Sequence, residues 1–293
     1  MLWVKIARMP ELPEVETIVR RYRRLVVNRR IVAFRSRWAR QVTPSVARVK
    51  RAIVGRTVVK LSRRAKYIVF HLDQNGYLLV HLRMSGRLEW AADHATEPPH
   101  VRAYWDFNDG NRLLFCDSRK FGRIVHGTDL KDLTRNLGPE PLERRFTADC
   151  LARILAGRSR QIKPLLLDQS IIVGLGNIYA DEALHRAGIH PVTRADRLNP
   201  RQIAALHESI RYILRKGIRH SGTTFDWIYP SGGMQKHLSV YGRTDEPCPT
   251  CNTPIEYLRV AQRGTHICPR CQPVDGVRQR RRKAASHTRK KRT

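Results

Sequence analysis

The sequence predicts an α+β fold in three parts: a β-sandwich domain, then a helical domain, then a small cysteine-centred module. Three observations favour this order. Short β-branched or aromatic segments separated by turn signals dominate residues 9–137, and helical periodicity replaces them in residues 138–237. Residues 238–272 then hold four closely spaced cysteines. The length of 293 residues also favours more than one domain, because single cores rarely grow this large.

The first domain is predicted to begin with an amphipathic helix and to continue as strands. Between Glu14 and Val26, apolar residues recur at steps of three and four, which is the helical period. Six strands follow, separated by turn signals such as Gln74-Asn75-Gly76. They are Ile31–Phe34, Val58–Leu61, Ile68–Leu72, Tyr77–Leu82, Ala103–Phe107 and Arg112–Cys116. Repeated short strands at this spacing indicate a β-sandwich.

The second domain is predicted to contain four helices. They are Thr147–Ala156, Ile162–Asp168, Ile178–Ala187 and Pro200–Gly217. The fourth has Asn199 as its N-cap and a proline at its first position, where no N–H group is needed. Before the third, Gly174 and Gly176 form a tight turn that is expected to bring the helix N-terminus to the surface. Free backbone N–H groups there would suit a phosphate, but the Gly-x-Gly pattern taken alone favours a simple turn without a ligand.

Lysine and arginine outnumber aspartate and glutamate by 56 to 25, which gives a formal net charge of +31. Such an excess favours a polyanionic partner, and nucleic acid is the leading candidate. A solvated basic surface is the alternative, and part of the charge does lie in Arg278–Thr293, which carries nine basic residues and no acidic residue. Subtracting these nine charges from +31 leaves +22, so the rest of the chain is basic by itself.

No segment approaches the roughly 20 consecutive apolar residues of a membrane-spanning helix. The opening residues, Met1–Arg8, are too short for a signal peptide. An anionic membrane surface could attract the basic chain, but no amphipathic helix with a matching apolar face accompanies the charge. We therefore expect a soluble cytoplasmic protein without a membrane partner.

Four of the six cysteines form two C-x-x-C pairs with 16 residues between them. They are Cys248, Cys251, Cys268 and Cys271, whereas Cys116 and Cys150 stand alone. This spacing is typical of a zinc ribbon or zinc finger, in which four thiolates bind one Zn²⁺ tetrahedrally. Two disulfides are the alternative, which a reducing cytosol disfavours. One structural zinc ion is therefore expected in residues 238–272, with no open coordination position for catalysis.

The segment Met9–Thr17, which reads Met-Pro-Glu-Leu-Pro-Glu-Val-Glu-Thr, resembles the N-terminus of formamidopyrimidine-DNA glycosylases. The resemblance spans Met9 to about Gln272 and continues, in order, through Arg63–Tyr67, His81–Gly86, Asp117–Gly122, Leu137–Leu142, Gly174–Asp181, Val240–Arg243 and the four cysteines. Leu12 favours this branch over the related endonuclease VIII branch, in which glycine is usual. The resemblance implies a β-sandwich, a helical domain with a helix–two-turn–helix motif, a zinc finger, and DNA bound in the cleft between the domains.

The resemblance also implies a bifunctional DNA glycosylase and AP lyase. Pro10 would be the terminal residue, and its secondary amine would attack C1′ of the damaged nucleotide, because an α-amino group with a pKa of about 7.7–8.0 is partly neutral at cellular pH. The resulting Schiff base would permit β- and δ-elimination without a catalytic metal. Glu11 matches the general acid and base that assists sugar ring opening. Glu14 matches a supporting carboxylate, and Lys66 matches a cation of the catalytic site.

Two further groups are implied to bind DNA. Together with Lys66, the positions that match the family's phosphate contacts are His81, Asn177, Tyr241 and Arg263, the last of them on the zinc-finger hairpin. Met84, Arg119 and Phe121 match a wedge that fills the gap left by the flipped base. Without the resemblance, a lone His81 would more often be structural, and composition alone would place Met84 and Phe121 in the core.

Three segments depart from the family pattern. Residues 1–8 would convert the amine of Pro10 into an amide, so we expect the functional form to start at Met9 and to lose that methionine. The segment Phe225–Leu238 is shorter than the loop that typically caps 8-oxoguanine. Residues 273–293 form a basic tail without a counterpart in the family core, and their composition predicts disorder and non-specific phosphate contacts.

The expected partner is double-stranded DNA that contains oxidised purines, such as formamidopyrimidines and 8-oxoguanine, or abasic sites. The protein is expected to act as a monomer associated with the nucleoid of a bacterial-type cell. Two alternatives stay open. One is a relative with the same chemistry that prefers oxidised pyrimidines or single-stranded lesions. The other is a DNA-binding protein that uses the zinc finger and the helical motif without catalysis.

Overall fold

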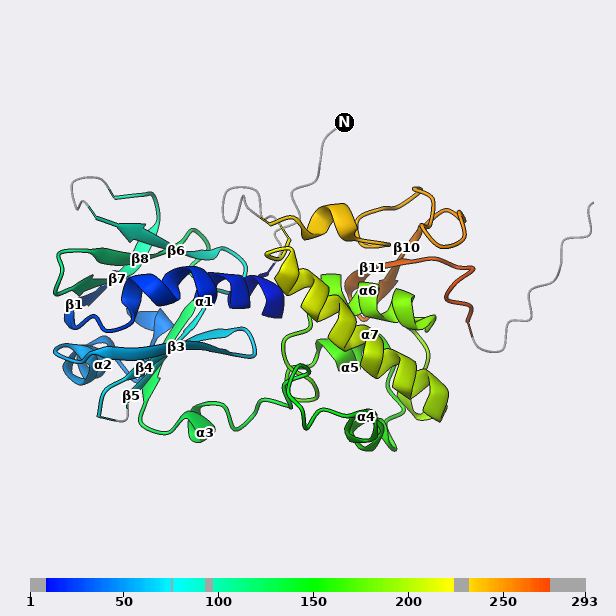
Figure 1. The fold of residues 1–293 in the computed structure, drawn as a ribbon, viewed down its shortest axis with the longest axis horizontal. Helices are drawn as coiled ribbons and strands as arrows, with labels where there is room; N and C mark the ends of the chain where they lie inside the picture. Colours follow the sequence, from blue (N-terminus) through cyan, green and yellow to red (C-terminus); the bar gives the residue numbers. More distant parts are fainter. Residues whose placement is uncertain (1–8, 75, 93–96, 224–231, 275–293) are drawn as a thin grey trace, which may run out of the picture.

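A computed structural model of the protein describes residues 9–74, 76–92, 97–223 and 232–274. It has a mixed α+β fold in which two lobes lie side by side (Figure 1). Strands dominate one lobe, and helices together with a two-stranded hairpin form the other. The predicted order of a β-sandwich, a helical domain and a cysteine-centred module is confirmed. Within the described part of the chain, no helix has the length and apolar character that crossing a membrane requires.

Two sheets form the sandwich. One has the strand order β1-β7-β8-β6, with β1 Ile31–Ser36, β6 Gly86–Ala91, β7 Val101–Phe107 and β8 Arg112–Asp117. The other has the order β2-β9-β5-β4-β3, with β2 Val42–Thr43, β3 Val58–Arg64, β4 Tyr67–Leu72, β5 Gly76–His81 and β9 Arg123–Gly127. Neighbouring strands are antiparallel except β2 and β9. The six predicted strands are confirmed, whereas the sequence patterns do not predict β2, β6 and β9.

Aromatic and aliphatic side chains fill the space between the sheets. Phe34 and Phe70 both stack on Trp105, at ring-centroid distances of 5.5 and 6.1 Å. Helix α2 (Val46–Ile53) packs beside β1 and β2. Helix α1 (Leu12–Val26) contributes its apolar side to the same core and runs along β3 toward the second lobe, where it contacts α7 (Figure 1). The start of α1 therefore lies where the two lobes meet.

Helix α1 begins at Leu12, two residues earlier than the apolar period predicts. Glu11 and Glu14 form a reciprocal capping box at its start, which satisfies backbone N–H groups that the first turn leaves without partners. Pro13 lies in that first turn, where a residue without an N–H group is tolerated. Local hydrogen bonding thus extends the helix up to the acidic residue next to Pro10.

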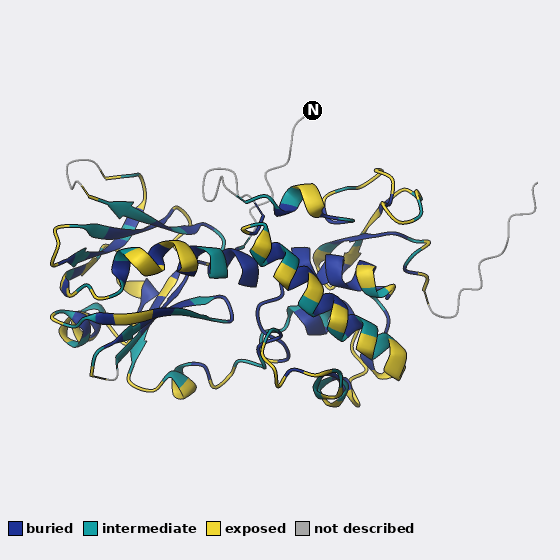
Figure 2. Cartoon of the chain, viewed as in Figure 1, coloured by how far each residue is buried: buried dark blue, intermediate teal, exposed yellow. Residues whose placement is uncertain are grey.

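The second lobe contains the four predicted helices. They are α4 (Ala148–Leu155), α5 (Ile162–Leu167), α6 (Asn177–Ala187) and α7 (Pro200–Arg219). A further short helix, α3 (Leu130–Leu133), lies in the connection from the first lobe. Short 3₁₀ turns occur at Ala39–Gln41, Ala195–Arg197 and Met234–His237. Asn199 caps α7 and accepts a hydrogen bond from Gln202 N at 2.9 Å, which confirms the predicted N-cap. One side of α7 is exposed (Figure 2), and its apolar side packs against α4 and α6.

Glu140, in the connection between the lobes, binds the hairpin of β3 and β4. Its carboxylate accepts hydrogen bonds from the side chains of Arg63 and Arg64 and from the backbone N–H of Ala65, at distances of 2.6–3.2 Å. Charge-assisted contacts of this kind hold planar groups in a fixed orientation. Glu140 therefore orients the turn that carries Lys66.

The third part of the chain is the hairpin of β10 (Glu256–Val260) and β11 (Arg263–Ile267). Two adjacent carboxylates of α6 anchor this hairpin and the segment that precedes it. Asp181 accepts a hydrogen bond from His266 N at 3.0 Å, and Glu182 accepts hydrogen bonds from the backbone N–H groups of residues 239–241 at 2.8–2.9 Å. Residues 1–8, residues 224–231 of the predicted short loop, and the predicted tail beyond residue 274 lie outside the described residues.

Candidate active site

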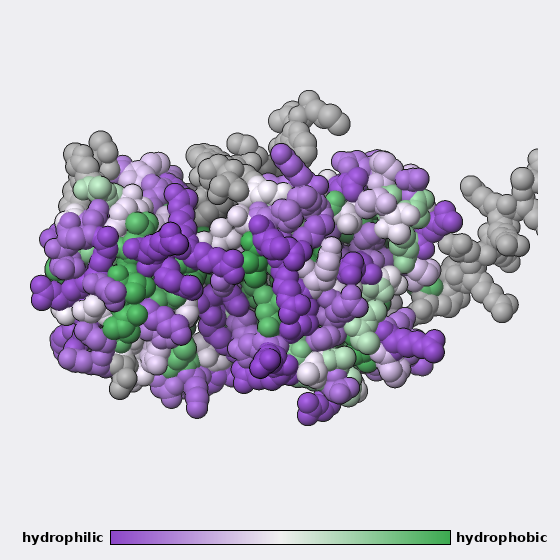
Figure 3. Space-filling model, viewed as in Figure 1, coloured by the Kyte–Doolittle hydropathy of each residue, from purple (hydrophilic) through white to green (hydrophobic). Residues whose placement is uncertain are grey.

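A cleft of about 600 Å³ lies between the loops of the sandwich, the start of α6 and the β10–β11 hairpin. Seven of the predicted site residues line it: Glu11, Lys66, Met84, Phe121, Asn177, Tyr241 and Arg263. His81 and Arg119 each contact a lining residue, Arg83 and Phe121 respectively. The fold therefore brings together residues from all three predicted parts of the chain. Hydrophilic side chains cover most of the face shown in Figure 3, in keeping with the high charge.

Glu11 lies against the N-terminus of α6 and is 3% exposed. Its carboxylate accepts hydrogen bonds from the backbone N–H groups of Gly176, Ile178 and Tyr179, at 2.5, 2.9 and 3.4 Å. Such groups have no partner within the helix itself, and the positive end of the helix dipole favours an anion beside them. The start of α6 therefore holds Glu11 in the cleft.

The Gly174–Gly176 turn does not bring free N–H groups to the surface, so the structure supports the simple turn that the sequence favours over the phosphate clamp. Both glycines are buried, and the N–H groups at the start of α6 bind Glu11 instead of a phosphate. A Cβ at Gly176 would lie 2.4 Å from Glu11 Cδ, and a Cβ at Gly174, whose φ is +89°, would lie 2.5 Å from Leu12 Cδ1. Gly176 therefore makes room for the Glu11 carboxylate, whereas Gly174 makes room for Leu12 and has a positive φ that favours glycine.

Burial raises the pKa of Glu11 to about 7. Desolvation is the largest cause, the positive charge of Lys66 opposes it, and the negative charge of Glu14 adds to it. Burial also lowers the pKa of the Lys66 amine, although the two carboxylates oppose this shift. A carboxyl group with a pKa near 7 can both donate and accept a proton at neutral pH, which a general acid and base requires.

Glu14 is a buried carboxylate with four hydrogen-bond donors. It accepts hydrogen bonds from Glu11 N at 3.0 Å and from the Tyr179 hydroxyl at 2.7 Å. The backbone N–H and the hydroxyl of Thr223 also donate to it, at 2.7 and 3.1 Å. Glu14 therefore ties the start of α1 to α6 and to the segment that follows α7. These contacts suit the supporting role that the sequence predicts.

Pro10 is buried directly before Glu11, and its nitrogen is in a peptide bond with Met9. The nitrogen lone pair of such a bond is delocalised into the carbonyl and is not available for attack on carbon. Met9 itself lines the cleft. Removal of the residues up to Met9 would therefore leave a secondary amine at the wall of the cleft, next to Glu11.

His81 is the last residue of β5 and is 7% exposed. Burial, with the charges of Arg83 and Lys66, lowers its pKa to about 3, so the imidazole is neutral at physiological pH. Its Nδ1 accepts a hydrogen bond from Arg83 N at 3.0 Å, which leaves the ring proton on Nε2. A neutral ring in this tautomer can donate one hydrogen bond to a phosphate oxygen.

Met84, Arg119 and Phe121 meet on two neighbouring loops. The guanidinium of Arg119 lies 4.8 Å from the centre of the Phe121 ring, and its Nη1 lies 3.6 Å from Met84 Sδ. Phe121 is 46% exposed, so the core position that composition alone suggests is wrong for this residue. An exposed apolar side chain beside a cation can enter a base stack and contact the unpaired base.

Asp117 fixes the loop between β8 and β9. Its fully buried carboxylate accepts hydrogen bonds from Ser85 Oγ, from Arg119 N at 3.2 Å and from Gly122 N at 2.7 Å. Because Ser85 directly follows Met84, the same carboxylate holds both loops of the exposed cluster. The predicted wedge residues are therefore held by a buried carboxylate, and a rigid support of this kind would suit insertion into DNA.

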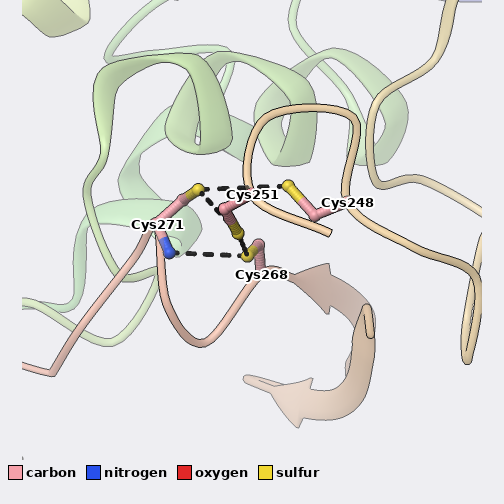
Figure 4. A group of neighbouring side chains, drawn as sticks. All are labelled: Cys248, Cys251, Cys268 and Cys271. Atoms are coloured by element: carbon pink, nitrogen blue, oxygen red, sulfur yellow. Dashed lines mark hydrogen bonds between the residues drawn. The ribbon is translucent and has the colours of Figure 1, made fainter. Parts of the chain in front are cut away.

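The four predicted zinc ligands converge near the base of the β10–β11 hairpin (Figure 4). They are Cys248, Cys251, Cys268 and Cys271, and all four are free thiols, so the alternative of two disulfides is wrong. Their sulfur atoms lie within 4.8 Å of one another, and three of the pairs are 3.4–3.9 Å apart. Sulfur atoms about 2.3 Å from a tetrahedral Zn²⁺ would be about 3.8 Å apart. The cluster therefore fits one structural zinc ion.

Lys163 is a functional neighbour that sequence reasoning misses. It is 0% exposed, and its Nζ contacts Asp181 Oδ1 at 2.6 Å, Gly264 O at 3.0 Å and Thr265 Oγ1 at 2.7 Å. The only sign in the sequence is a lysine inside the apolar segment of α5. Since Gly264 and Thr265 directly follow Arg263, this ion pair fixes the backbone beside that arginine.

A histidine of α6 also contacts the cysteine cluster. His185 Nε2 lies 3.5 Å from Cys248 Sγ, and burial lowers the pKa of this imidazole, which keeps it neutral. A neutral ring that donates to a metal-bound thiolate orients that ligand and reduces its negative charge. Through Asp181, Glu182 and His185, α6 thus holds the cysteine module with one end and Glu11 with the other.

A carboxyl group with a pKa near 7, in a cationic cleft beside an exposed wedge and a four-cysteine hairpin, defines an enzyme that acts on nucleic acid. Three family models match the chain in sequence order. The formamidopyrimidine-DNA glycosylase N-terminal domain matches residues 9–124, the formamidopyrimidine-DNA glycosylase H2TH domain matches residues 137–227, and the zinc finger found in FPG and IleRS matches residues 245–274. The chain belongs to the formamidopyrimidine-DNA glycosylase family, and it is a base-excision repair enzyme.

Similar proteins agree with this assignment. The formamidopyrimidine-DNA glycosylase of Herpetosiphon aurantiacus is 47% identical over 272 residues, which cover 90% of this chain and 100% of that protein. The formamidopyrimidine-DNA glycosylase of Chloroflexus aggregans is 45% identical over 271 residues, which cover 90% of this chain and 98% of that protein. Among solved structures, the Lactococcus lactis enzyme in complex with abasic-site DNA superposes with a TM-score of 0.85 at 36% identity, over 90% of this chain and 100% of that chain.

Proposed function

We propose that this protein removes oxidised purines from double-stranded DNA and then cleaves the strand, with the amine of Pro10 as nucleophile and Glu11 as general acid and base. The observation that carries the proposal is the position of Glu11. It directly follows Pro10, lines the cleft, and has a pKa raised to about 7 by burial. A carboxyl group in this state can transfer protons to and from a sugar bound in the cleft.

The chemistry uses these residues, a bound nucleotide and water. The amine attacks C1′ while the bond to the damaged base breaks, and the base leaves with a proton. Protonated Glu11 donates its proton to the ring oxygen O4′, the sugar opens, and an iminium forms between C1′ and Pro10. The iminium acidifies the C2′ hydrogen, so transfer of that proton to the now ionised Glu11 expels the 3′ phosphate, and a second elimination expels the 5′ phosphate. Water then hydrolyses the iminium and releases the sugar from Pro10.

The other predicted residues would hold the DNA in this cleft. Lys66, Arg263 and the neutral His81 offer one or more donors to phosphates, and Asn177 and Tyr241 add polar contacts from the second lobe. The cluster of Met84, Arg119 and Phe121 would replace the flipped nucleotide in the stack. With a net charge of +31, the protein would stay associated with the nucleoid of a bacterial cytoplasm.

The proposed nucleophile requires a free amine at Pro10, so the functional form would begin there, after translation from Met9 and loss of the methionine. One observation supports this start: the first family match begins at residue 9.

Borohydride trapping tests the proposal. A protein that begins at Pro10 should give a covalent complex with lesion-containing duplex, because borohydride reduces the iminium to a stable amine. A protein forced to retain residues 1–8 should bind the duplex and give no such complex. Pro10→Gly should trap poorly, and Glu11→Gln should process lesions poorly. Equal trapping by the extended protein would show that another residue is the nucleophile, whereas binding without any trapping would favour the non-catalytic alternative.

A second substrate class has one observation in its favour. The Lactococcus lactis enzyme, which superposes with a TM-score of 0.85, has been solved in complex with DNA that contains Fapy-dG and also with DNA that contains an oxidized pyrimidine. Excision rates on matched duplexes with a formamidopyrimidine, 8-oxoguanine or an oxidised pyrimidine would rank the two classes. We expect the purine lesions to be excised faster.

A further inference from the structure

Tyr257 is an exposed aromatic residue in the wall of the cleft, to which neither the sequence patterns nor the mechanism above gives a role. It lies on β10, it is 56% exposed, and it lines the cleft together with Asn177, Tyr241 and Arg263. More than half of its surface therefore faces solvent, so packing within the protein does not account for an aromatic side chain here.

The ring of Tyr257 has a defined position. Tyr257 pairs with His266 across the hairpin, the two rings meet edge to face at 5.4 Å, and His266 lies 4.9 Å from the ring of Tyr241. These three rings form a row along the zinc hairpin. The row leads from Tyr241, a predicted phosphate contact, to Tyr257.

The hydroxyl end of this ring lies over the tip of the hairpin. A Cβ at Gly264 would be 2.8 Å from the Tyr257 hydroxyl and 2.9 Å from Cε2, so the glycine leaves room for the ring. The φ of Gly264 is not positive, so the missing side chain, and not the backbone conformation, is what makes room for this ring position. The hydroxyl thus lies next to the backbone of Arg263. Among the described residues it has no hydrogen-bond partner.

We propose that Tyr257 is a further contact to the backbone of the lesion strand, with its hydroxyl donating to a phosphate next to the one bound by Arg263 and its ring packing on the deoxyribose. This inference rests on the proposed function of the cleft and adds one residue to it. A phenol in this place supplies a directed donor and apolar area without charge, and the neighbouring Arg263 and the exposed Arg259 supply the positive potential.

The test is equilibrium binding of the zinc-loaded protein, in the form that gives the covalent complex, to a duplex with an uncleavable tetrahydrofuran abasic analogue. Tyr257→Ala should weaken binding about tenfold and Tyr257→Phe about fivefold, because a hydrogen bond to a charged phosphate is lost in both. The dependence of log K on log salt should keep its slope, since no cation is removed. Arg263→Ala, in contrast, should reduce the magnitude of that slope by about 1.

Tyr212→Ala is the matched control. Tyr212 is also an exposed tyrosine, but it lies on α7 beneath Arg186 and does not line the cleft. It should bind the duplex as the unsubstituted protein does. Zinc content and melting temperature, measured for every variant, separate a lost contact from a folding defect.

Two results would overturn the inference while leaving the proposed function intact. One is wild-type affinity of Tyr257→Ala in the same assay in which Arg263→Ala binds weakly. The other is wild-type affinity of Tyr257→Phe, which would show that the hydroxyl makes no contact. If the unsubstituted protein neither binds the abasic duplex nor gives a covalent complex, the proposed function itself fails.

Discussion

The hydroxyl of Tyr179 donates a hydrogen bond of 2.7 Å to Glu14, the same carboxylate that receives the backbone N–H of Glu11. This places a second acid, held by fixed donors, directly behind the acid in the cleft. The negative charge of Glu14 is one of the causes that raise the pKa of Glu11, and the positive charge of Lys66 is the cause that opposes them most strongly. Burial therefore raises the proton affinity of Glu11 most, and these two neighbours of opposite sign adjust it.

The first prediction concerns the pH dependence of base excision. Excision requires Glu11 with its proton and the Pro10 amine without one. The single-turnover rate should therefore be greatest between the pKa of Glu11, about 7, and that of an α-amino group, about 7.7–8.0, and should decline at higher pH as Glu11 ionises. It should also decline at low pH, where the amine of Pro10 is protonated. The pKa of His81, about 3, lies too low for this residue to cause either limb.

Two substitutions should move the alkaline limb in opposite directions. Lys66→Gln removes the charge that stabilises ionised Glu11, so the limb should shift to higher pH. Glu14→Gln removes a repelling charge, so the limb should shift to lower pH. The measurement is the excision rate of the unsubstituted protein, Lys66→Gln and Glu14→Gln as a function of pH, from pH 5 to pH 9. A limb that stays at the same pH in both variants would show that Glu11 is not the group that titrates.

The second prediction concerns the wedge. Phe121→Ala should slow excision of a lesion from a duplex about tenfold, equivalent to about 1.4 kcal/mol, because the flipped state loses the side chain that replaces the base. Arg119→Ala should weaken discrimination between the bases opposite the lesion. Cleavage of a preformed abasic site should suffer less in both variants. Equal losses on the two substrates would instead indicate general damage to the fold.

The third prediction concerns the cysteine cluster. Cys248→Ser should release about one zinc ion per chain and abolish duplex binding, because the hairpin that carries Arg263 loses its metal. Cys150→Ser is the control, since Cys150 lies on α4 outside the cluster and should keep both zinc and affinity. Metal content by atomic absorption and binding by titration are the measurements. Full affinity in a zinc-free protein would contradict the role of the cluster.

Local rules explain which elements the sequence could predict. Helix α7 was predictable because its signals, the capping residue Asn199 and the apolar stripe that follows, lie close together in the sequence. The zinc site was predictable for the same reason, since the cysteines of each C-x-x-C pair are close neighbours. Strands β6 and β9 carry arginine, glutamate or histidine among their apolar residues, so their pattern is weak. Their pairing with β8 and β5 decides their structure.

Contacts between distant residues explain the remainder. The sequence at the start of α6 is compatible with a simple turn or a phosphate site, and only the fold shows that Glu11, 165 residues before Gly176, binds there. Lys163 likewise lacks a recognisable pattern, because its partners Gly264 and Thr265 follow about a hundred residues later. The family resemblance supplied the roles of Pro10 and the wedge, which composition and periodicity could not.

The last prediction concerns the buried ion pair of Lys163 and Asp181, whose side chains are both 0% exposed. Lys163→Met should destabilise the zinc-loaded protein by about 3–5 kcal/mol, because it leaves Asp181 charged, buried and unpaired. Duplex binding should also weaken, since Gly264 O and Thr265 Oγ1 lose the ammonium that holds the backbone beside Arg263. Adding Asp181→Asn should restore part of the stability, because the amide oxygen still accepts the hydrogen bond from His266 N while the charge is gone. Urea unfolding of the single and double variants measures both effects, and a single variant as stable as the unsubstituted protein would show that the pair does not fix the hairpin.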